Sequence, residues 1–236
     1  MMVTALLTAA GTGSRMHMEI PKQFYHVENK PLILYTMEKF QRHPGVDQIV
    51  VVTVPAWMDL VRAYAAQYQI TKLKWIVPGG ATGQESILNG LKKIKEEGGS
   101  DDDVVMVHDG NRCMVSQEII SNSLTVFAEK GSAVAAIPCV EAVFRSSDDG
   151  ESSTISIPRE QLFRTQTPHT YTLGKLLWAH EEAAKRGIES TAASCVLMQQ
   201  LGETVYFSRG SEENLKVTTM DDLHIFEALV QYNKGR

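Results

Sequence analysis

The sequence predicts an α/β fold with a mostly parallel sheet, helices on both faces and a protruding β-arm. Apolar, strand-like runs alternate with amphipathic stretches of helix length from residue 3 to residue 137, which is the pattern of repeated βαβ units. The apolar runs do not alternate with polar residues, as expected for strands that are covered on both faces. After Pro138 this pattern stops and a polar stretch begins, so we expect the arm to leave the core there.

The first half of the chain carries the strand–helix alternation. The helix expected at Pro31–Gln41 begins with a proline, which suits a first helical turn, and places Ile33, Met37 and Phe40 on one face. A later helix has Ser116 as its N-cap and is ended by Gly131. The other elements expected in this half are a helix at Gln84–Glu97 and strands at Val3–Thr8, Ile49–Val54, Val104–Val107 and Ala133–Ile137.

The second half begins with the arm, residues 139–165, in which short β-like pieces flank a polar stretch. The arm has too few regularly spaced apolar residues to form a core alone, so we expect it to pack on a second subunit in a two-fold homodimer. We expect a single domain over residues 1–236 with the arm inserted in it. The remaining expected elements are helices near Leu173–Arg186 and Thr191–Leu201, a strand at Val205–Ser208 and a last helix from Met220.

Composition narrows the class of protein. The 236 residues are 43% hydrophobic and 22% charged, as in an ordinary globular protein. A net charge of −5 is unfavourable for sequence-independent nucleic-acid binding, and no run of 18 apolar residues predicts a membrane span. The N-terminus lacks the pattern of a secretory signal, and three cysteines without a CxxC motif suit a reduced, cytoplasmic protein. We therefore expect neither nucleic acid nor membrane as a partner.

A Gly-rich loop follows the first predicted strand. Gly11 and Gly13 allow the backbone to approach a phosphate closely. Met16 stands at the third glycine of a dinucleotide fingerprint, and no Gly-Lys-Ser/Thr follows, so neither that motif nor a P-loop is present. Arg15 and Lys22 suit a triphosphate that loses pyrophosphate, because fixed cations stabilise the charge that builds on it. The alternative is an ordinary turn with solvated cations.

Two further motifs lie where an open α/β sheet binds its ligands. Asp109 follows a buried strand, and this end of a strand is the usual ligand side. Asp109 could hold a phosphate-bound Mg²⁺ and Arg112 could contact phosphate; alternatively, Asp109 caps a turn and Arg112 is exposed. Gly80 and Ser86 flank a Gly-rich helix entrance that suits either a base or ribose pocket or a plain loop.

Taken together, the motifs resemble one family. Ala-Gly-x-Gly-x-Arg-Met, Pro-Lys-Gln-Phe, Gly-Gly, His-Asp-x-x-Arg, Gln166–Pro168 and Asn214–Thr218 occur in this order across residues 3–230. This ordered set resembles the cytidylyltransferases that act on polyol phosphates. They include the 2-C-methyl-D-erythritol 4-phosphate enzyme of isoprenoid synthesis and the ribitol 5-phosphate enzyme of teichoic acid synthesis. The resemblance implies a Rossmann-like, three-layer nucleotidyltransferase fold and a homodimer with swapped arms.

The resemblance also implies roles for individual residues. Arg15 and Lys22 match the catalytic cations, and Lys216 matches a second lysine on the phosphates. Asp109 matches the acidic residue near the metal, which we expect to be Mg²⁺. The positions matched around the base, ribose and phosphates of CTP are Ala9, Ala10, Gly11, Gly13, Gly80, Ser86 and Asp109.

On the acceptor side the match is weaker. Arg112 matches an arginine beside the site, and Arg159 aligns with an arginine that reaches the partner subunit's site and binds the polyol phosphate there. Four positions depart from the family pattern: Ala142 replaces a threonine, Cys113 a proline, Gly83 a common arginine, and Ala193 lies in a segment that has lost its usual acidic residue. The acceptor alcohol is therefore less certain from the sequence than the nucleotide.

The prediction is an enzyme that transfers CMP from CTP to a polyol phosphate and releases pyrophosphate. The family default for the acceptor is 2-C-methyl-D-erythritol 4-phosphate; ribitol 5-phosphate or a related pentitol phosphate is the alternative. Two other classes stay open. A catalytically silent nucleotide-binding homologue would explain the acceptor-side departures. A nicotinamide oxidoreductase would also begin with a strand and a Gly-rich turn, although Met16 argues against it.

Overall fold

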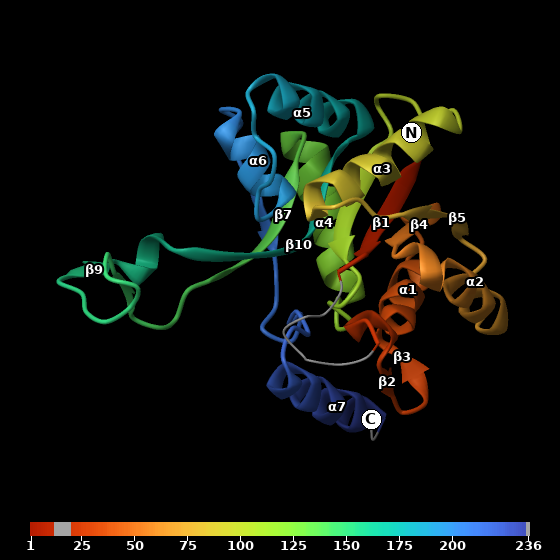
Figure 1. The fold of residues 1–236 in the computed structure, drawn as a ribbon, viewed down its shortest axis with the longest axis horizontal. Coiled ribbons are helices and arrows are strands. Elements are labelled where there is room, and N and C mark those ends of the chain that lie inside the picture. Colours follow the sequence, from red (N-terminus) through yellow and green to blue (C-terminus); the bar gives the residue numbers. More distant parts are fainter. Residues whose placement is uncertain (12–19, 235–236) are drawn as a thin grey trace.

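A computed structural model of the chain describes residues 1–11 and 20–234. Within these residues, a seven-stranded sheet has the order β11-β7-β10-β6-β1-β4-β5 (Figure 1). Every strand runs in one direction except β10, which is antiparallel to both of its neighbours. The strands of the sheet are β1 Val3–Ala9, β4 Gln48–Thr53, β5 Leu73–Pro78, β6 Val104–Asp109, β7 Ala133–Pro138, β10 Phe163–Thr172 and β11 Phe207–Arg209.

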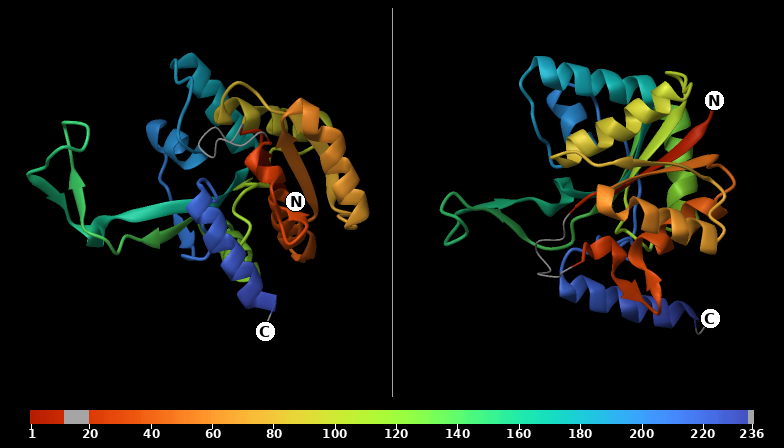
Figure 2. Two further views of the ribbon diagram at one scale, coloured as in Figure 1. Left: turned by 60° about the horizontal axis from the view of Figure 1, so that its bottom comes forward. Right: turned by 45° about the vertical axis from the view of Figure 1, so that its right-hand side comes forward.

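Helices cover both faces of the sheet, which confirms the predicted fold class. Alternate residues of β1 point to opposite faces, so Leu7 packs in one buried cluster and Leu6 in the other. Helices α1, α2 and α4 pack on the first face, and α3, α5 and α6 on the second (Figure 2). Their bounds are α1 Leu32–Arg42, α2 Met58–Gln67, α3 Gly83–Glu96, α4 Gln117–Lys130, α5 Leu173–Lys185 and α6 Ser194–Gln200.

A smaller unit lies beside the end of the sheet. The last helix, α7 (Met220–Lys234), packs Phe226 edge to face against Tyr35 of α1, with ring centroids 5.1 Å apart. The short strands β2 (His26–Val27) and β3 (Lys30–Pro31) pair next to it. Single turns of 3-10 helix lie at Lys22–Phe24, Pro55–Trp57 and Arg159–Gln161. Among the described residues, no helix is both long and apolar enough to cross a bilayer.

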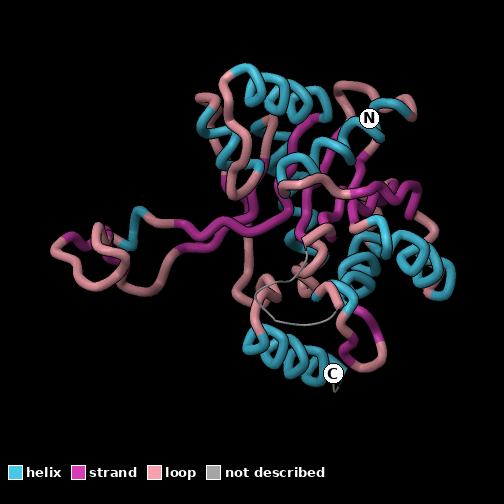
Figure 3. Tube along the Cα trace, viewed as in Figure 1, coloured by secondary structure: helices cyan, strands magenta, loops and turns pink. Residues whose placement is uncertain are grey.

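The arm projects away from the body of the molecule in every view (Figures 1 and 3). It continues β7 and returns through β10, with Phe163 opposite Pro138 and Thr165 opposite Ala136. At its tip, β8 (Val143–Arg145) and β9 (Ile155–Ile157) form a two-stranded hairpin. The predicted excursion is therefore present, although its expected packing on a second subunit is a prediction that a single chain does not test.

The central strand β10 differs from the sequence expectation, which ended the arm at residue 165 and assigned no strand after it. Polar residues and a proline interrupt the apolar pattern at Gln166, Thr167 and Pro168, and proline is rare in central strands. These side chains are nevertheless buried. Gln166 and Thr167 are tolerated there because they hydrogen-bond to neighbouring segments rather than to water.

Candidate active site

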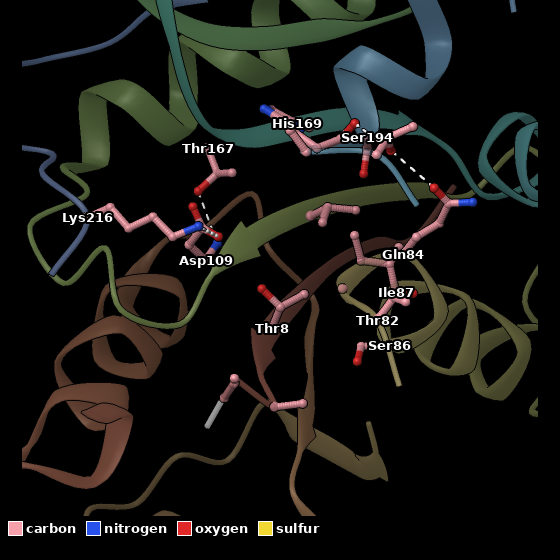
Figure 4. Close-up of a pocket in the computed structure, with 18 of the residues that line it drawn as sticks. Thr8, Thr82, Gln84, Ser86, Ile87, Asp109, Thr167, His169, Ser194 and Lys216 are labelled. Carbon is pink, nitrogen blue, oxygen red and sulfur yellow. Dashed lines mark hydrogen bonds and ion pairs between the residues drawn. The ribbon is translucent and has the colours of Figure 1, made fainter. Parts of the chain in front are cut away.

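A cavity of about 630 Å³ opens at the carboxyl ends of β1 and β6. It is bounded by the ends of these strands, by the start of α3, by β10 and by the start of α6 (Figure 4). Ligands of open α/β sheets bind at this edge. The predicted site residues that line the cavity are Ala9, Ala10, Gly11, Lys22, Gly80, Ser86, Asp109, Arg112 and Lys216. The predicted residues Gly13 and Arg15 lie outside the described part of the chain.

The start of the Gly-rich loop is tied to the turn that carries Lys22. The buried Gln23 side chain donates through Nε2 to the carbonyl oxygens of Ala9 and Gly11, the second at 3.1 Å. Thr53 also donates its hydroxyl to the Ala9 carbonyl, at 3.1 Å. These contacts fix where β1 ends relative to the single turn Lys22–Phe24, so the lysine and the loop form one side of the cavity.

A second Gly-rich segment lines the cavity beside this loop. The N–H of Gly80 donates to Ser86 Oγ at 3.0 Å, and Thr82 caps α3 by accepting from the Glu85 N–H at 3.0 Å. At the neighbouring Gly79, a Cβ atom would lie 2.3 Å from the Cβ of Ala10. Only glycine permits this close approach. The helix entrance therefore lies directly against the loop that follows β1.

Asp109 is the centre of the charged end of the cavity. Its Oδ1 lies 2.8 Å from Lys216 Nζ, and its Oδ2 lies 3.0 Å from Arg112 Nε (Figure 4). Burial raises the pKa of the Asp109 carboxyl, but the charges of Lys216 and Arg112 outweigh burial and hold this pKa well below its ordinary value. The carboxylate is therefore ionised at neutral pH and orients both cations.

The end of β6, which bears Asp109, is held by a buried histidine that sequence analysis did not assign. His108 Nδ1 lies 3.0 Å from Thr167 Oγ1, and its Nε2 lies 3.2 Å from the carbonyl oxygen of Arg112. Burial lowers the pKa of His108 to about 4, so its ring is neutral at neutral pH. A neutral ring that donates from Nε2 to the carbonyl accepts at Nδ1 from the Thr167 hydroxyl. The oxygen of this hydroxyl in turn accepts from the Asp109 N–H at 3.0 Å.

The other end of the cavity is polar but uncharged among the described residues that line it. Thr191 donates its hydroxyl to Gln84 Oε1 at 3.1 Å, and Gln84 Nε2 donates to the Ile188 carbonyl at 3.0 Å (Figure 4). Burial lowers the pKa values of His169 and His180 to about 4, so both rings are neutral at neutral pH. This end suits a neutral base or polyol, whereas the charged end suits phosphates. Sequence analysis missed Gln84 and Thr191 because scattered hydroxyl and amide side chains form no motif.

Arg159 is separated from the cavity of its own chain. It lies on the arm, where its guanidinium donates to the Val140 carbonyl at 3.0 Å and approaches Glu160 at 3.5 Å. It is not among the residues that line the cavity. This position agrees with an arginine that serves another subunit, and its role in binding the acceptor phosphate stays a prediction.

The four departures from the family pattern fall in different places. Gly83 and Ala193 line the cavity, and a Cβ atom at Gly83 would meet nothing within 4 Å, so there is room where arginine is common. Ala142 is exposed on the arm. Cys113 is buried with its Sγ 3.3 Å from the Leu32 carbonyl, and burial raises its pKa to about 12. The thiol is therefore a packing group.

The residues present fit a metal that arrives with a nucleotide. Asp109 is the one carboxylate among the described residues that line the cavity. No group of three or more His, Cys, Asp or Glu side chains suited to a metal occurs in the part of the chain that the structure describes. Mg²⁺ commonly binds through one or two carboxylates together with substrate phosphates and water, so the single carboxylate of this cavity fits such a metal.

A mixed sheet with a cationic cavity at the ends of its strands, opposite a Gly-rich loop, is the architecture of a nucleotidyltransferase. Comparison with known proteins agrees with this class. The family model described as IspD, 2-C-methyl-D-erythritol 4-phosphate cytidylyltransferase, matches residues 3–232. The chain belongs to this family of CTP-dependent cytidylyltransferases. The predicted family is thus confirmed, and the oxidoreductase alternative is excluded.

Individual relatives carry two different names. The chain is 39% identical to a ribitol-5-phosphate cytidylyltransferase of Lacticaseibacillus paracasei, over 98% of each chain. It is 36% identical to a 2-C-methyl-D-erythritol 4-phosphate cytidylyltransferase of Clostridium acetobutylicum, over 97% of each chain. Among solved structures, the 2-C-methyl-D-erythritol 4-phosphate cytidylyltransferase of Thermus thermophilus superimposes with a TM-score of 0.76 at 26% identity, covering 98% of this chain and all of the other.

Proposed function

We propose that this cytidylyltransferase transfers CMP from CTP to a four- or five-carbon polyol phosphate and releases pyrophosphate. The observation that carries the proposal is the charged end of the cavity, where Lys216 and Arg112 flank Asp109. 2-C-Methyl-D-erythritol 4-phosphate is the expected acceptor, which would place the reaction in isoprenoid precursor synthesis. Ribitol 5-phosphate is the second candidate, favoured by the name of the relative that is 39% identical.

The reaction needs positioning and charge stabilisation rather than a covalent intermediate. A phosphate oxygen of the acceptor is already a nucleophile and attacks the α-phosphate in line with the departing pyrophosphate. Lys22, Lys216 and the predicted Arg15 would stabilise the negative charge that develops there. The Lys216 side chain is 41% exposed, so it can turn from Asp109 toward a triphosphate. Mg²⁺, held by Asp109 and the phosphates, would neutralise part of the triphosphate charge.

We further propose a homodimer in which the arm completes the partner's site. Large apolar side chains are exposed along the arm, including Val140 at 57%, Phe144 at 60% and Ile155 at 52%. Such exposure on a thin projection is costly in water and favours a covering surface. The buried free thiols Cys113 and Cys195 are compatible with the cytoplasm as the place of action.

The decisive experiment is a pyrophosphate-release assay. Each of the four common nucleoside triphosphates is combined with 2-C-methyl-D-erythritol 4-phosphate, ribitol 5-phosphate, and erythritol and xylitol phosphates. We expect release only with CTP and a clear preference for one acceptor. CTP binding without turnover of any acceptor would instead identify a catalytically silent homologue.

A further inference from the structure

Lys216 lies in a segment that has no regular secondary structure of its own. Residues 211–217, here called the strap, connect β11 to α7 and belong to neither a helix nor a strand in the described chain. A segment without a ladder of backbone hydrogen bonds must be held by other contacts if it is to place a side chain accurately. The contacts that hold the strap come from buried amide side chains.

The first of these amides is Gln166 of β10. Its Nε2 donates to the Ser211 carbonyl at 2.8 Å, and its Oε1 accepts from the Ser211 N–H at 3.1 Å. The same Oε1 accepts from Asn214 Nδ2 at 3.3 Å. Gln166 is only 6% exposed. One side chain thus fixes the start and the middle of the strap.

The second amide is Asn214, which is fully buried. Its Nδ2 also donates to the backbone carbonyl of Thr167 at 3.0 Å. The backbone carbonyl of Asn214 accepts from the Arg112 guanidinium at 2.8 Å. On the other side of Lys216, the Val217 N–H donates to the Asn111 carbonyl at 3.0 Å. Lys216 therefore lies between two fixed residues, and both are attached to the loop that follows Asp109.

Gln166 is also the point where the arm enters the core. The first three residues of β10 are exposed and burial begins at Gln166. Just before it, Arg164 pairs with Glu212 of the strap at 2.5 Å. The base of the arm and the strap are consequently joined side by side through an ion pair and a set of amide hydrogen bonds.

We propose that Gln166 and Asn214 are positioning residues that hold Lys216 in register with Asp109 and couple its place to the base of the arm. Neither amide needs to touch a substrate for this role. The proposal rests on the function proposed above, in which Lys216 stabilises the transferring phosphates. The competing explanation is that the two amides only satisfy buried polar atoms and stabilise the fold.

A double-mutant cycle separates the two explanations. We expect Asn214→Ala to lower kcat roughly 10- to 100-fold, since a small displacement of a catalytic group can cost about this much, and to change the KM for CTP by less than about threefold. In a Lys216→Ala background the same substitution should cost less than about twofold more, because its target is gone. Equal losses in both backgrounds would show a purely structural role and overturn the proposal.

Two further variants provide a second test and a control. Gln166→Met keeps the length of the side chain without its polar atoms. Its loss of kcat should likewise be smaller in the Lys216→Ala background than in the wild type. If Asn214→Ala does not fold, this variant tests the proposal in its place. Asn122→Ala removes a less buried asparagine, whose Oδ1 accepts from the Arg209 N–H at 2.7 Å on the strand before the strap. This control should change kcat by less than about twofold.

A readout without catalysis tests the geometry directly. Trace labelling with acetic anhydride, followed by peptide mass spectrometry, measures how readily Lys216 Nζ reacts. We expect faster acetylation of Lys216 in Asn214→Ala and Gln166→Met than in the wild type, relative to Lys175 as internal reference. Unchanged labelling would overturn the proposal. If the wild type turns over no polyol phosphate, the acceptor assignment fails, while the labelling still tests the positioning.

Discussion

The cavity and the arm are built in opposite ways. In the cavity, one of the two ion pairs of Asp109 joins distant parts of the sequence: Asp109 and Lys216 are separated by 107 positions. At the tip of the arm, contacts are local. Asp148 at the tip accepts from the hydroxyls of Ser146 and Ser152, both at 2.5 Å, two and four positions away. Distant parts of the chain thus assemble the cavity, whereas the tip of the arm is held mainly by contacts within the arm.

This difference indicates what each region would bind. The charged groups of the cavity are paired before any ligand is present, so the site is preorganised for a polyanion that can replace one carboxylate. The arm instead leaves apolar side chains and Arg159 at the surface, where Arg159 is 58% exposed. These exposed groups are the reason for proposing that the arm contacts a second subunit. The predictions below test this contrast.

The largest effect is expected in the cavity. Arg15→Ala and Lys22→Ala should each lower kcat by about 100-fold or more, because each removes a cation that we propose stabilises the developing charge. CTP affinity, measured by calorimetry, should change much less. Lys175→Ala is the control, because Lys175 pairs with Glu203 at 2.7 Å on the surface. Near-normal turnover in both Arg15→Ala and Lys22→Ala would refute the catalytic assignment.

The next largest effect is expected from the arm, which we propose completes the site of the partner subunit. Arg159→Ala should raise the KM for the acceptor about 10- to 100-fold, the scale of a lost charge-assisted hydrogen bond, and leave the KM for CTP nearly unchanged. Arg145→Ala, also on the arm, is the matched control. In mixtures of Arg159→Ala with Lys22→Ala, activity should return, because one site of a mixed dimer has both residues intact. Lack of recovery after demonstrated subunit exchange would contradict the shared site.

Assembly itself should respond to the tip of the arm. Phe144→Asp combined with Ile155→Asp places two charges where apolar contact is expected, and should weaken dimerisation at least tenfold. Sedimentation equilibrium at micromolar concentration measures this against the wild type, with Asp149→Ala as a control on the same arm. A wild type that sediments only as a 26.2 kDa monomer would eliminate the dimer.

The smallest expected effect is on the free energy of unfolding and comes from His108, the buried histidine beside the cavity. The pKa of His108 is lowered to about 4 from 6.5 by burial, so between these values the unfolded chain binds a proton that the folded protein does not. Stability from this group is complete above pH 6.5 and falls as the pH drops toward 4. We expect a loss of about 1 kcal/mol per such histidine between pH 7 and 5.5. Urea unfolding of the wild type and of His108→Gln measures it; identical pH slopes would remove His108 as the cause.

Local signals explain which elements were predictable. The helix with Ser116 as N-cap and Gly131 as stop was found because capping is local: Ser116 Oγ accepts from the Ile119 N–H at 3.2 Å, and Gly131 has a φ of 78°. Helix α2 and strand β5 were missed. Only Val61 and Ala65 of α2 are buried, and β5 is an edge strand with one fully buried residue, Val77. Elements that bury little carry a weak pattern.

The residues of the candidate site also fall into those that local sequence patterns identify and those that they do not. Lys22 and Asp109 were identified because charged residues next to glycines and strand ends form recognisable motifs, and Lys216 was identified through the family resemblance; the structure brings all three to one cavity. Gln84 and Gln166 were not assigned roles, since their function depends on partners about 45 to 100 positions away. Sequence spacing contains no information on such contacts until the fold is known.

The position of β10 in the sheet also constrains the order in which the chain can fold. Because β10 lies between β6 and β7, these two strands have no direct pairing with each other. A nascent chain that ends before Phe163 can align β1, β4, β5 and β6, but β7 then has no neighbour on that side. The ribosome must release residues 163–172 before the two parts of the sheet join, and until then two strand edges are open to wrong partners.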